Sequence, residues 1–381
     1  MKGKHKNPLK HLFASVRGDR LRSKISHLVD WEPLIDPEPG CTAIIGMCSR
    51  VPEVLAANIR CLNKFRWPDL KRVLVVVDCE ETSNLRAIEA ETRTACSGLR
   101  IEFIFYSPTQ AALAKSLDIS FVYSWLSWCI ALKCTNTKHV LIHDYDALVL
   151  SPRLEERYRT FAASRAVVQG IAWYKSNGIE TEDHLATTFE AFVDTKWLRS
   201  CHPVELFNKV RNVGGRSIDF DTTLDIQHRL LTPEQRTMAP MNADELMHPS
   251  QMICQYTMFR HSPSAELPCF SIPMIPFFIY LSGRTSAIED ATIAIKQGEI
   301  RDIDLLNDGT HFNFSKMDIP QVDWLLKQAV QACVALQIPP SRAIHEYGRA
   351  LYGLIGTPAQ DVWRGDFTSK QRSWIQEAQN S

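Results

Sequence analysis

The order of apolar runs and helical patterns between residues 42 and 150 constrains the fold more than any other feature of this sequence. Short apolar runs, beginning with TAIIGM and VLVVV, alternate with segments whose apolar residues recur every three or four positions. Continuous apolar runs are typical of parallel strands, which are buried on both faces, and the segments between them predict crossover helices. The expected strands are 42–47, 73–77, 100–108 and 139–146, and the expected helices are 52–65, 83–95 and 121–135.

This pattern predicts an α/β fold in which helices flank a mostly parallel, Rossmann-like sheet. After Pro152 the pattern is less regular, although RAVVQGIAWY (165–174) predicts a further strand. Two amphipathic patterns, 321–336 and 341–355, predict a helical appendage at the C-terminal end. We therefore expect a basic N-terminal arm at 1–38, an α/β domain at 39–318 and a helical segment at 319–381.

Composition limits the classes of function. Lys and Arg number 43, as do Asp and Glu, so no overall positive field would draw the protein to nucleic acid. The eleven cysteines include no Cys-x-x-Cys pair, which indicates free thiols in a reducing cytoplasm. The most apolar run, 269–283, is interrupted by Pro273 and Pro276 and is shorter than the ~20 residues of a spanning helix, so we interpret it as a core segment.

The N-terminal residues 1–24 are rich in Lys and Arg. They lack the long apolar core of a signal peptide, and one interpretation is a solvated arm. The same charge also suits a peripheral contact with an anionic partner or with the inner face of a membrane. The sequence leaves both interpretations open.

An aspartate pair follows the fourth expected strand. In KHVLIHDYDALVL (138–150) an apolar run is followed directly by Asp144 and Asp146. Carboxylates beside a buried strand are unfavourable unless a positive charge lies against them. The cations Mg²⁺ and Mn²⁺ prefer oxygen ligands and could supply that charge. In open α/β sheets ligands bind beyond the carboxyl ends of the strands, so we expect a metal ion there that bridges a nucleotide diphosphate. The alternative is a pair that caps a turn or binds a nearby arginine.

The motifs at the ends of these strands resemble a known family. IIGMCSRVPEVLAANIRCL (44–62), RVLVVVDCEE (72–81) and HVLIHDYDALV (139–149) look like the nucleotide-binding half of GT-A glycosyltransferases, with a family 2-like start and an Asp-x-Asp pair. The resemblance implies transfer of a hexose from a nucleotide-sugar donor to a glycan or lipid-linked acceptor, as in polysaccharide biosynthesis, with Mn²⁺ or Mg²⁺. It also implies a nucleotide-binding half at 39–152 and an acceptor half at 153–318.

The resemblance implies roles for five residues at the strand ends. Ser49 and Arg50 would lie along the nucleotide, and Asp78 would contact its base or ribose. Asp144 and Asp146 would hold ribose and metal. The turn after Asp78 reads Asp-Cys-Glu, where the family usually has Asp-Asp-Gly-Ser, and Asp78 has an alternative role as a favourable charge at a helix N-terminus.

A late histidine is implied as a third metal ligand. DGTHFNFSK (308–316) places His311 five residues before Lys316, which loosely resembles a family loop whose His binds the metal and whose Lys binds the diphosphate. His248 and His261 are alternatives to His311.

An inverting transfer also needs a carboxylate that deprotonates the acceptor hydroxyl. SIDFDTTLD (217–225) offers Asp219 and Asp221, which alternatively cap the helix expected after them. Glu182 and Asp183 are further candidates. The sequence does not distinguish an inverting from a retaining reaction.

Two other functions stay open. An apolar run followed by Asp-x-Asp also begins the HAD-type phosphatases, whose first aspartate is a nucleophile, and SIDFDTT has the threonine of that motif. That motif belongs on a first strand, whereas Asp144 and Asp146 follow the fourth. The second alternative is a protein of GT-A shape that binds nucleotide or glycan without catalysis.

Overall fold

The chain forms two compact units, each assembled from three separate stretches of sequence. The computed structural model describes residues 2–261 and 269–381. The expected boundary near residue 318 falls inside the second unit. Unit 1 consists of Met1–Arg50, Arg66–Tyr145 and Arg153–Met241, and unit 2 consists of Val51–Phe65, Asp146–Pro152 and Asn242–Ser381.

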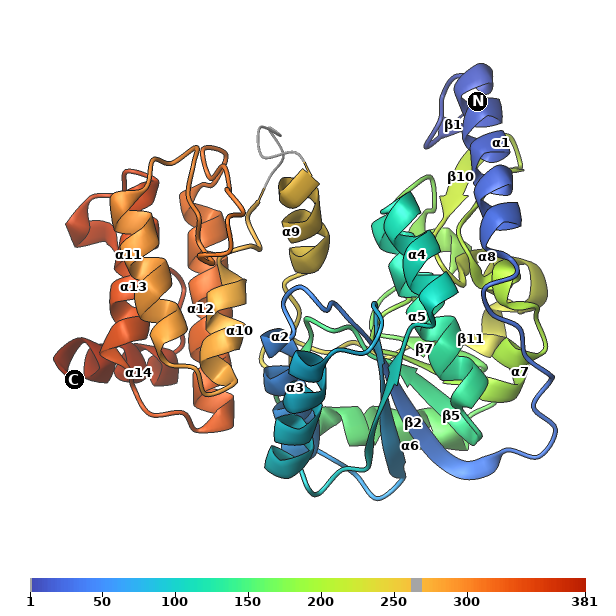
Figure 1. The fold of residues 1–381 in the computed structure, drawn as a ribbon, viewed down its shortest axis with the longest axis horizontal. Coiled ribbons are helices and arrows are strands. Elements are labelled where there is room, and N and C mark those ends of the chain that lie inside the picture. The colour runs from blue at the N-terminus through green and yellow to red at the C-terminus, as the bar shows by residue number, and fades with distance from the viewer. Residues whose placement is uncertain (1, 262–268) are drawn as a thin grey trace. The chain divides into compact units, whose positions relative to one another are not determined.

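Unit 1 is built on a seven-stranded sheet in the order β11-β7-β8-β5-β2-β3-β4 (Figure 1). Its centre, from β5 through β2 and β3 to β4, is parallel, and β8 runs antiparallel to both of its neighbours. The predicted α/β class with a mostly parallel sheet is confirmed. The strands are β2 (Glu38–Met47), β3 (Leu70–Val77), β4 (Ile101–Phe105), β5 (Thr137–Ile142), β7 (Val168–Gly170), β8 (Ala191–Asp194) and β11 (Arg236–Met238).

Helices cover both faces of this sheet. On one face, Val140 of β5 joins the core cluster that contains Trp125. Its neighbour His139 points to the other face, where its ring packs against Tyr158. Adjacent residues of a strand point to opposite faces, so each central strand contributes to two cores. Trp125 belongs to α5 (Ser120–Cys134) and Tyr158 to α6 (Arg153–Ala163), and the other helices around the sheet are α3 (Ser83–Ala95), α4 (Pro108–Leu117) and α7 (Thr195–Arg199).

The N-terminal residues, one interpretation of which was a solvated arm, form an ordered helix in unit 1. Asn7 caps this helix by accepting a hydrogen bond from the Leu9 amide, and Pro8 occupies the first helical position, where its missing N–H is not needed. The helix packs beside a three-stranded sheet of order β1-β10-β9. These elements are α1 (Pro8–Ile25), β1 (Lys2–Gly3), β9 (Lys209–Val213) and β10 (Arg216–Phe220), followed by α8 (Leu224–Leu230).

Unit 2 is mainly helical, with one two-stranded ladder. The predicted helices at 321–336 and 341–355 are confirmed as α12 and α13, and the apolar run at 269–283 contributes the buried helix α10. No helix in the described ranges is both long and apolar enough to cross a bilayer. The elements are α2 (Glu53–Lys64), β6 (Leu148–Val149), β12 (Leu246–Met247), α9 (Met252–His261), α10 (Met274–Leu281), α11 (Ser286–Gln297), α12 (Ile319–Leu336), α13 (Arg342–Leu354) and α14 (Ser369–Asn380).

Candidate metal centre

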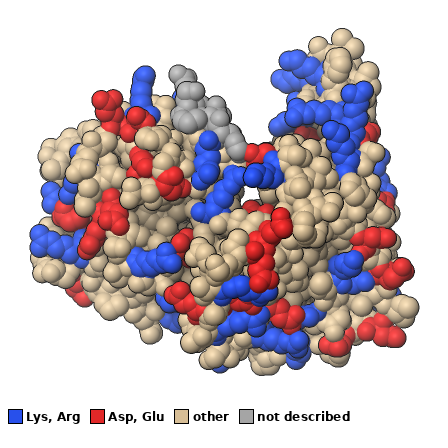
Figure 2. Space-filling model, in the orientation of Figure 1, with Lys and Arg blue, Asp and Glu red and all other residues tan. Residues whose placement is uncertain are grey.

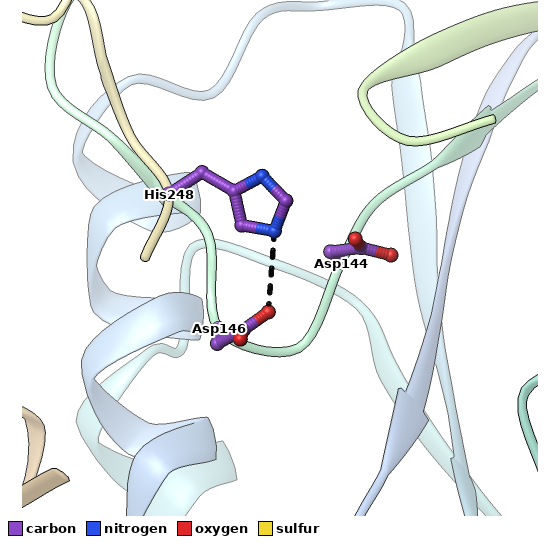
Figure 3. Close-up of side chains that lie close together, drawn as sticks. All are labelled: Asp144, Asp146 and His248. Atoms are coloured by element: carbon purple, nitrogen blue, oxygen red, sulfur yellow. Dashed lines mark ion pairs between the residues drawn. The ribbon is translucent and has the colours of Figure 1, made fainter. Parts of the chain in front are cut away.

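Asp144 and Asp146, in the loop that follows β5, come together with His248, which directly follows β12 (Figure 3). One ligand atom from each side chain lies within 4.8 Å of the other two. Oδ1 of Asp146 is 3.4 Å from Nε2 of His248, and Asp146 is buried. Asp144 is two positions before Asp146, so the chain itself keeps the two carboxylates together. Within the described ranges, no other group of three acidic, histidine or cysteine side chains meets in this way.

A short β-ladder explains how His248 reaches the aspartates. β12 pairs antiparallel with β6, with Leu246 opposite Val149 and Met247 opposite Leu148. Continuing this register places His248 beside the residues that immediately precede β6, which include Asp146. A two-residue strand leaves almost no pattern in a sequence, so the ladder could not be recognised there, although His248 was one of the alternatives.

The donor set suits a divalent cation. Carboxylate oxygens are preferred by Mg²⁺ and Mn²⁺, and a neutral imidazole nitrogen is a common ligand of first-row divalent metals. Asp146 is buried, and the ion pair that it forms is with a histidine, which is positive only when protonated. A divalent cation would neutralise the carboxylates and would be bound by the unprotonated imidazole of His248. The residues present therefore fit a metal ion.

The structure brings His248, and not His311, to the aspartates. Nδ1 of His311 lies 2.7 Å from Oδ1 of Asp302, and the side chain is 47% exposed. Its neighbour Phe312 is fully buried and exchanges backbone hydrogen bonds with Ile303, so the alternation of the extended chain turns His311 outward. Lys316 is also exposed. The side chain of His261 lies outside the described part of the chain.

Ser49 and Asp78 meet at the ends of β2 and β3. The amide of Ser49 donates a hydrogen bond of 2.8 Å to Oδ1 of Asp78. Because β2 and β3 are parallel neighbours, their carboxyl ends lie side by side, as the sequence predicted. Burial raises the pKa of Asp78. Arg50 follows Ser49 in the chain, and its Nη2 lies 3.8 Å from Oδ1 of Asp118.

Asp219 and Asp221 lie at the end of β10, and burial raises the pKa of both carboxyls. Oδ1 of Asp221 accepts hydrogen bonds from the Thr222 amide and from Nδ2 of Asn208. The negative charge of Asp144 is a further, smaller cause of the raised pKa of Asp221, so the two carboxyls are within electrostatic reach. The N-terminal cap of α8 is Thr223, so neither aspartate is the cap of that helix.

The other candidate bases have structural partners or lie on the surface. Asp183 binds the guanidinium of Arg216, with Oδ1 and Nη2 2.6 Å apart. Glu182 is exposed. Of the carboxylates that the sequence offered as a base, Asp221 is the one whose pKa is raised in part by the charge of Asp144.

Comparison with known proteins finds low similarity to several solved structures and no family. No known family model matches this sequence, and no curated protein matches it. A mannosyltransferase from Pyrobaculum calidifontis, solved with GDP-Man and Mn²⁺, aligns with 87% of this chain and 97% of its own at 13% identity and a TM-score of 0.35. TarS of S. aureus (residues 1–349) aligns with 90% of this chain and 91% of its own at 12% identity and a TM-score of 0.33.

A third solved structure is matched over a smaller part of both chains. The galactosyltransferase LgtC, solved with donor and acceptor sugar analogues, aligns with 43% of this chain and 62% of its own, at 16% identity and a TM-score of 0.32. This chain thus matches less than two thirds of LgtC. Similarity at such low TM-scores supports neither a fold nor a function for this chain, so the proposed function depends on the residues of the site.

Proposed function

We propose that this protein is a metal-dependent glycosyltransferase that moves a sugar from a nucleoside-diphosphate donor. The observation that carries the proposal is the group that His248 forms with Asp144 and Asp146, the two aspartates in the loop that follows the central parallel strand β5. β5 and β2 are parallel neighbours, so this loop and Ser49 belong to the same edge of the sheet. Ligands of open α/β sheets bind at that edge.

The chain's residues divide into two groups in this proposal. Asp144, Asp146 and His248 would hold a divalent ion, which when bound supplies Lewis-acid stabilisation of charge on a diphosphate leaving group. Asp78 would accept hydrogen bonds from the ribose or base, since its carboxylate is held at the strand end by the Ser49 amide. Arg50 would lie along the nucleotide.

Asp221 is the proposed base for the acceptor hydroxyl in an inverting transfer. Its pKa is raised by burial and, to a smaller extent, by the charges of Asp219 and Asp144, and a base with a raised pKa takes up a proton more readily. Asp219 lacks the influence of Asp144 among the causes of its shift. Asp221 is therefore preferred over Asp219.

A cavity of about 410 Å³ within unit 2 is the proposed binding site for an acceptor sugar. His248 lines it, so the cavity adjoins one of the three proposed metal ligands. Trp324 is 40% exposed and offers an aromatic face, on which the apolar C–H surface of a hexose would pack. The remaining lining residues are Ser250, Phe270, Ser271, Asp318, Pro320 and Gln321.

Thermal unfolding with nucleoside diphosphates tests the proposal. UDP, GDP or CDP together with Mn²⁺ is expected to raise the unfolding midpoint more than either component alone, because a ligand of the native state stabilises it. Slow hydrolysis of the matching nucleotide sugar without acceptor is the second expected result. Stabilisation without hydrolysis of any donor would favour the binding protein without catalysis. Turnover of a generic aryl phosphate would favour the phosphatase alternative.

A further inference from the structure

Helix α1 carries an apolar stripe that the fold of unit 1 leaves exposed. Leu9, Leu12, Phe13 and Val16 are 63%, 56%, 73% and 42% exposed. Their spacing of three, four and seven positions puts them on one face of the helix. Four large apolar side chains in one exposed stripe are an unusual feature of a protein surface, where such residues are normally scattered singly.

The opposite face of α1 is already occupied. Ile25 is buried and Leu21 is packed against the main core cluster of unit 1. Nη1 of Arg22 donates a hydrogen bond of 2.8 Å to the Phe207 carbonyl, and Nδ1 of His11 lies 2.7 Å from Oγ of Ser217. These contacts fix the rotation of the helix about its axis. The exposed stripe is therefore a consequence of how α1 is held and not of a loose segment.

Positive charge accompanies the stripe. The first 25 residues contain eight Lys and Arg and a single acidic residue, Asp19, although the whole chain has equal numbers of the two kinds. Lys10, Arg17 and Lys24 recur every seven positions and are exposed, so they form a basic row along one side of the apolar stripe. Figure 2 shows Lys and Arg side chains gathered on this helix, at the upper right.

We propose that α1 lies in the surface of an anionic lipid bilayer, with Leu9, Leu12, Phe13 and Val16 inserted among the acyl chains. A helix with an apolar face and a basic flank binds in this way, because apolar burial and attraction to anionic headgroups add. A second copy of the chain fits the surface poorly. Two such helices would bring like charges together, and four side chains are far fewer than the ~20–30 residues that each partner contributes to a stable protein interface.

Sedimentation with lipid vesicles tests this inference without any substrate. The unmodified protein is expected to sediment with vesicles of phosphatidylglycerol and phosphatidylcholine, to bind pure phosphatidylcholine vesicles much less, and to be released by salt of about 1 M. The double variant Leu12→Asp/Phe13→Asp is expected to bind anionic vesicles at least about tenfold more weakly. Lys10→Glu/Arg17→Glu is expected to lower binding to anionic vesicles and to leave the weak binding to neutral ones unchanged.

The matched control is Ile293→Asp, which places the same charge at an apolar residue of α11 that is 51% exposed. This variant is expected to bind vesicles like the unmodified protein. Leu9→Ser/Val16→Ser is a second, milder change that serves if the double aspartate variant lowers the unfolding midpoint. The inference is overturned if the unmodified protein does not bind anionic vesicles, or if both stripe variants bind them normally. A concentration-dependent dimer that Phe13→Asp dissociates, without vesicle binding, would assign the stripe to a second copy instead.

Discussion

Nδ1 of His143 lies 2.5 Å from Oε1 of Glu190, and both side chains are completely buried in unit 1. His143 directly precedes Asp144, and its amide also bonds to the Ile44 carbonyl of β2. The pair therefore holds the start of the loop that carries Asp144 and Asp146, two of the three proposed metal ligands. Glu190 itself has a left-handed backbone conformation, with φ of 48°.

Replacing Glu190 by Ala is expected to destabilise the protein by about 2 kcal/mol, because a buried imidazole loses this partner. Glu190→Gln keeps an acceptor for His143 and is expected to have the smaller effect. Chemical denaturation measures both. The exposed residue Glu182 supplies the control Glu182→Ala, for which no change is expected. Equal stability of Glu190→Ala and the unmodified protein would show that the pair does not support the loop.

Asp146→Asn is expected to weaken Mn²⁺ binding by at least about 100-fold, because it removes a ligand charge at the centre of the group. Calorimetric titration with Mn²⁺ measures the affinity. Asp304→Asn is the matched control, since Asp304 belongs to another Asp-x-Asp sequence but uses its carboxylate to accept hydrogen bonds from the Asp308 and Gly309 amides. A metal affinity unchanged by Asp146→Asn would remove the basis of the proposed function.

His248→Ala and His311→Ala distinguish the two histidines. His248→Ala is expected to weaken metal binding by about tenfold or more, because Nε2 of His248 lies beside Asp146. His311→Ala is expected to leave the affinity unchanged, because His311 pairs with Asp302. The same Mn²⁺ titration measures both variants. If His311→Ala weakens metal binding and His248→Ala does not, the third ligand is His311, as the family resemblance implies.

Asp221→Asn is expected to lower turnover by about 100-fold or more if the transfer inverts configuration, while Mn²⁺ affinity stays the same. The pKa of Asp221 is raised, so activity of the unmodified enzyme should rise with pH as this carboxyl loses its proton at a pH above the usual carboxylate range. Measuring turnover at a series of pH values tests for this rise in activity. Normal turnover of Asp221→Asn would exclude Asp221 as the base and would favour a retaining transfer.

The lowered pKa of His139 predicts that the folded protein loses stability in mild acid. Burial between the sheet and α6 lowers its pKa from 6.5 to about 4. Between these values the unfolded chain binds more protons than the folded one, so stability rises with pH and is lost as the pH falls from about 6.5 to about 4. Over this whole pH range the free energy of unfolding changes by about 3 kcal/mol.

Denaturation at a series of pH values measures the contribution of His139. His139→Gln is expected to flatten the slope between pH 4 and 6.5, and His27→Gln, at an exposed histidine, is expected to leave it unchanged. If His139→Gln retains the slope of the unmodified protein, another group causes the acid sensitivity.

The central strands were predictable from sequence, because a parallel strand buried on both faces is apolar at every position, as in Val73–Val77. The loop after β5 was predictable for the same reason, since polar residues end the apolar run. The sequence does not distinguish His248 from the other histidines, because the ladder that positions it has only two residues in each strand. The resemblance that implies His311 is local, and it carries no information on which way an extended segment turns its side chains.

The division into two units could not be read from sequence either. Contacts such as that between α2 and α10 join residues more than 200 positions apart, and no local pattern records them. Helix α1 is difficult to recognise in the sequence for a different reason. Its apolar residues lie on two opposite faces, which obscures the amphipathic pattern that identifies a surface helix.

Because unit 2 draws on three stretches of the chain, no single cut yields either unit whole. A fragment that ends at Met241 would keep every strand of the seven-stranded sheet and both loop aspartates. It would nevertheless leave α2 without α10, its packing partner, and β6 without β12. A truncated gene product of this kind would still carry the acidic signature that a motif search detects, but it would lack the histidine that completes the site.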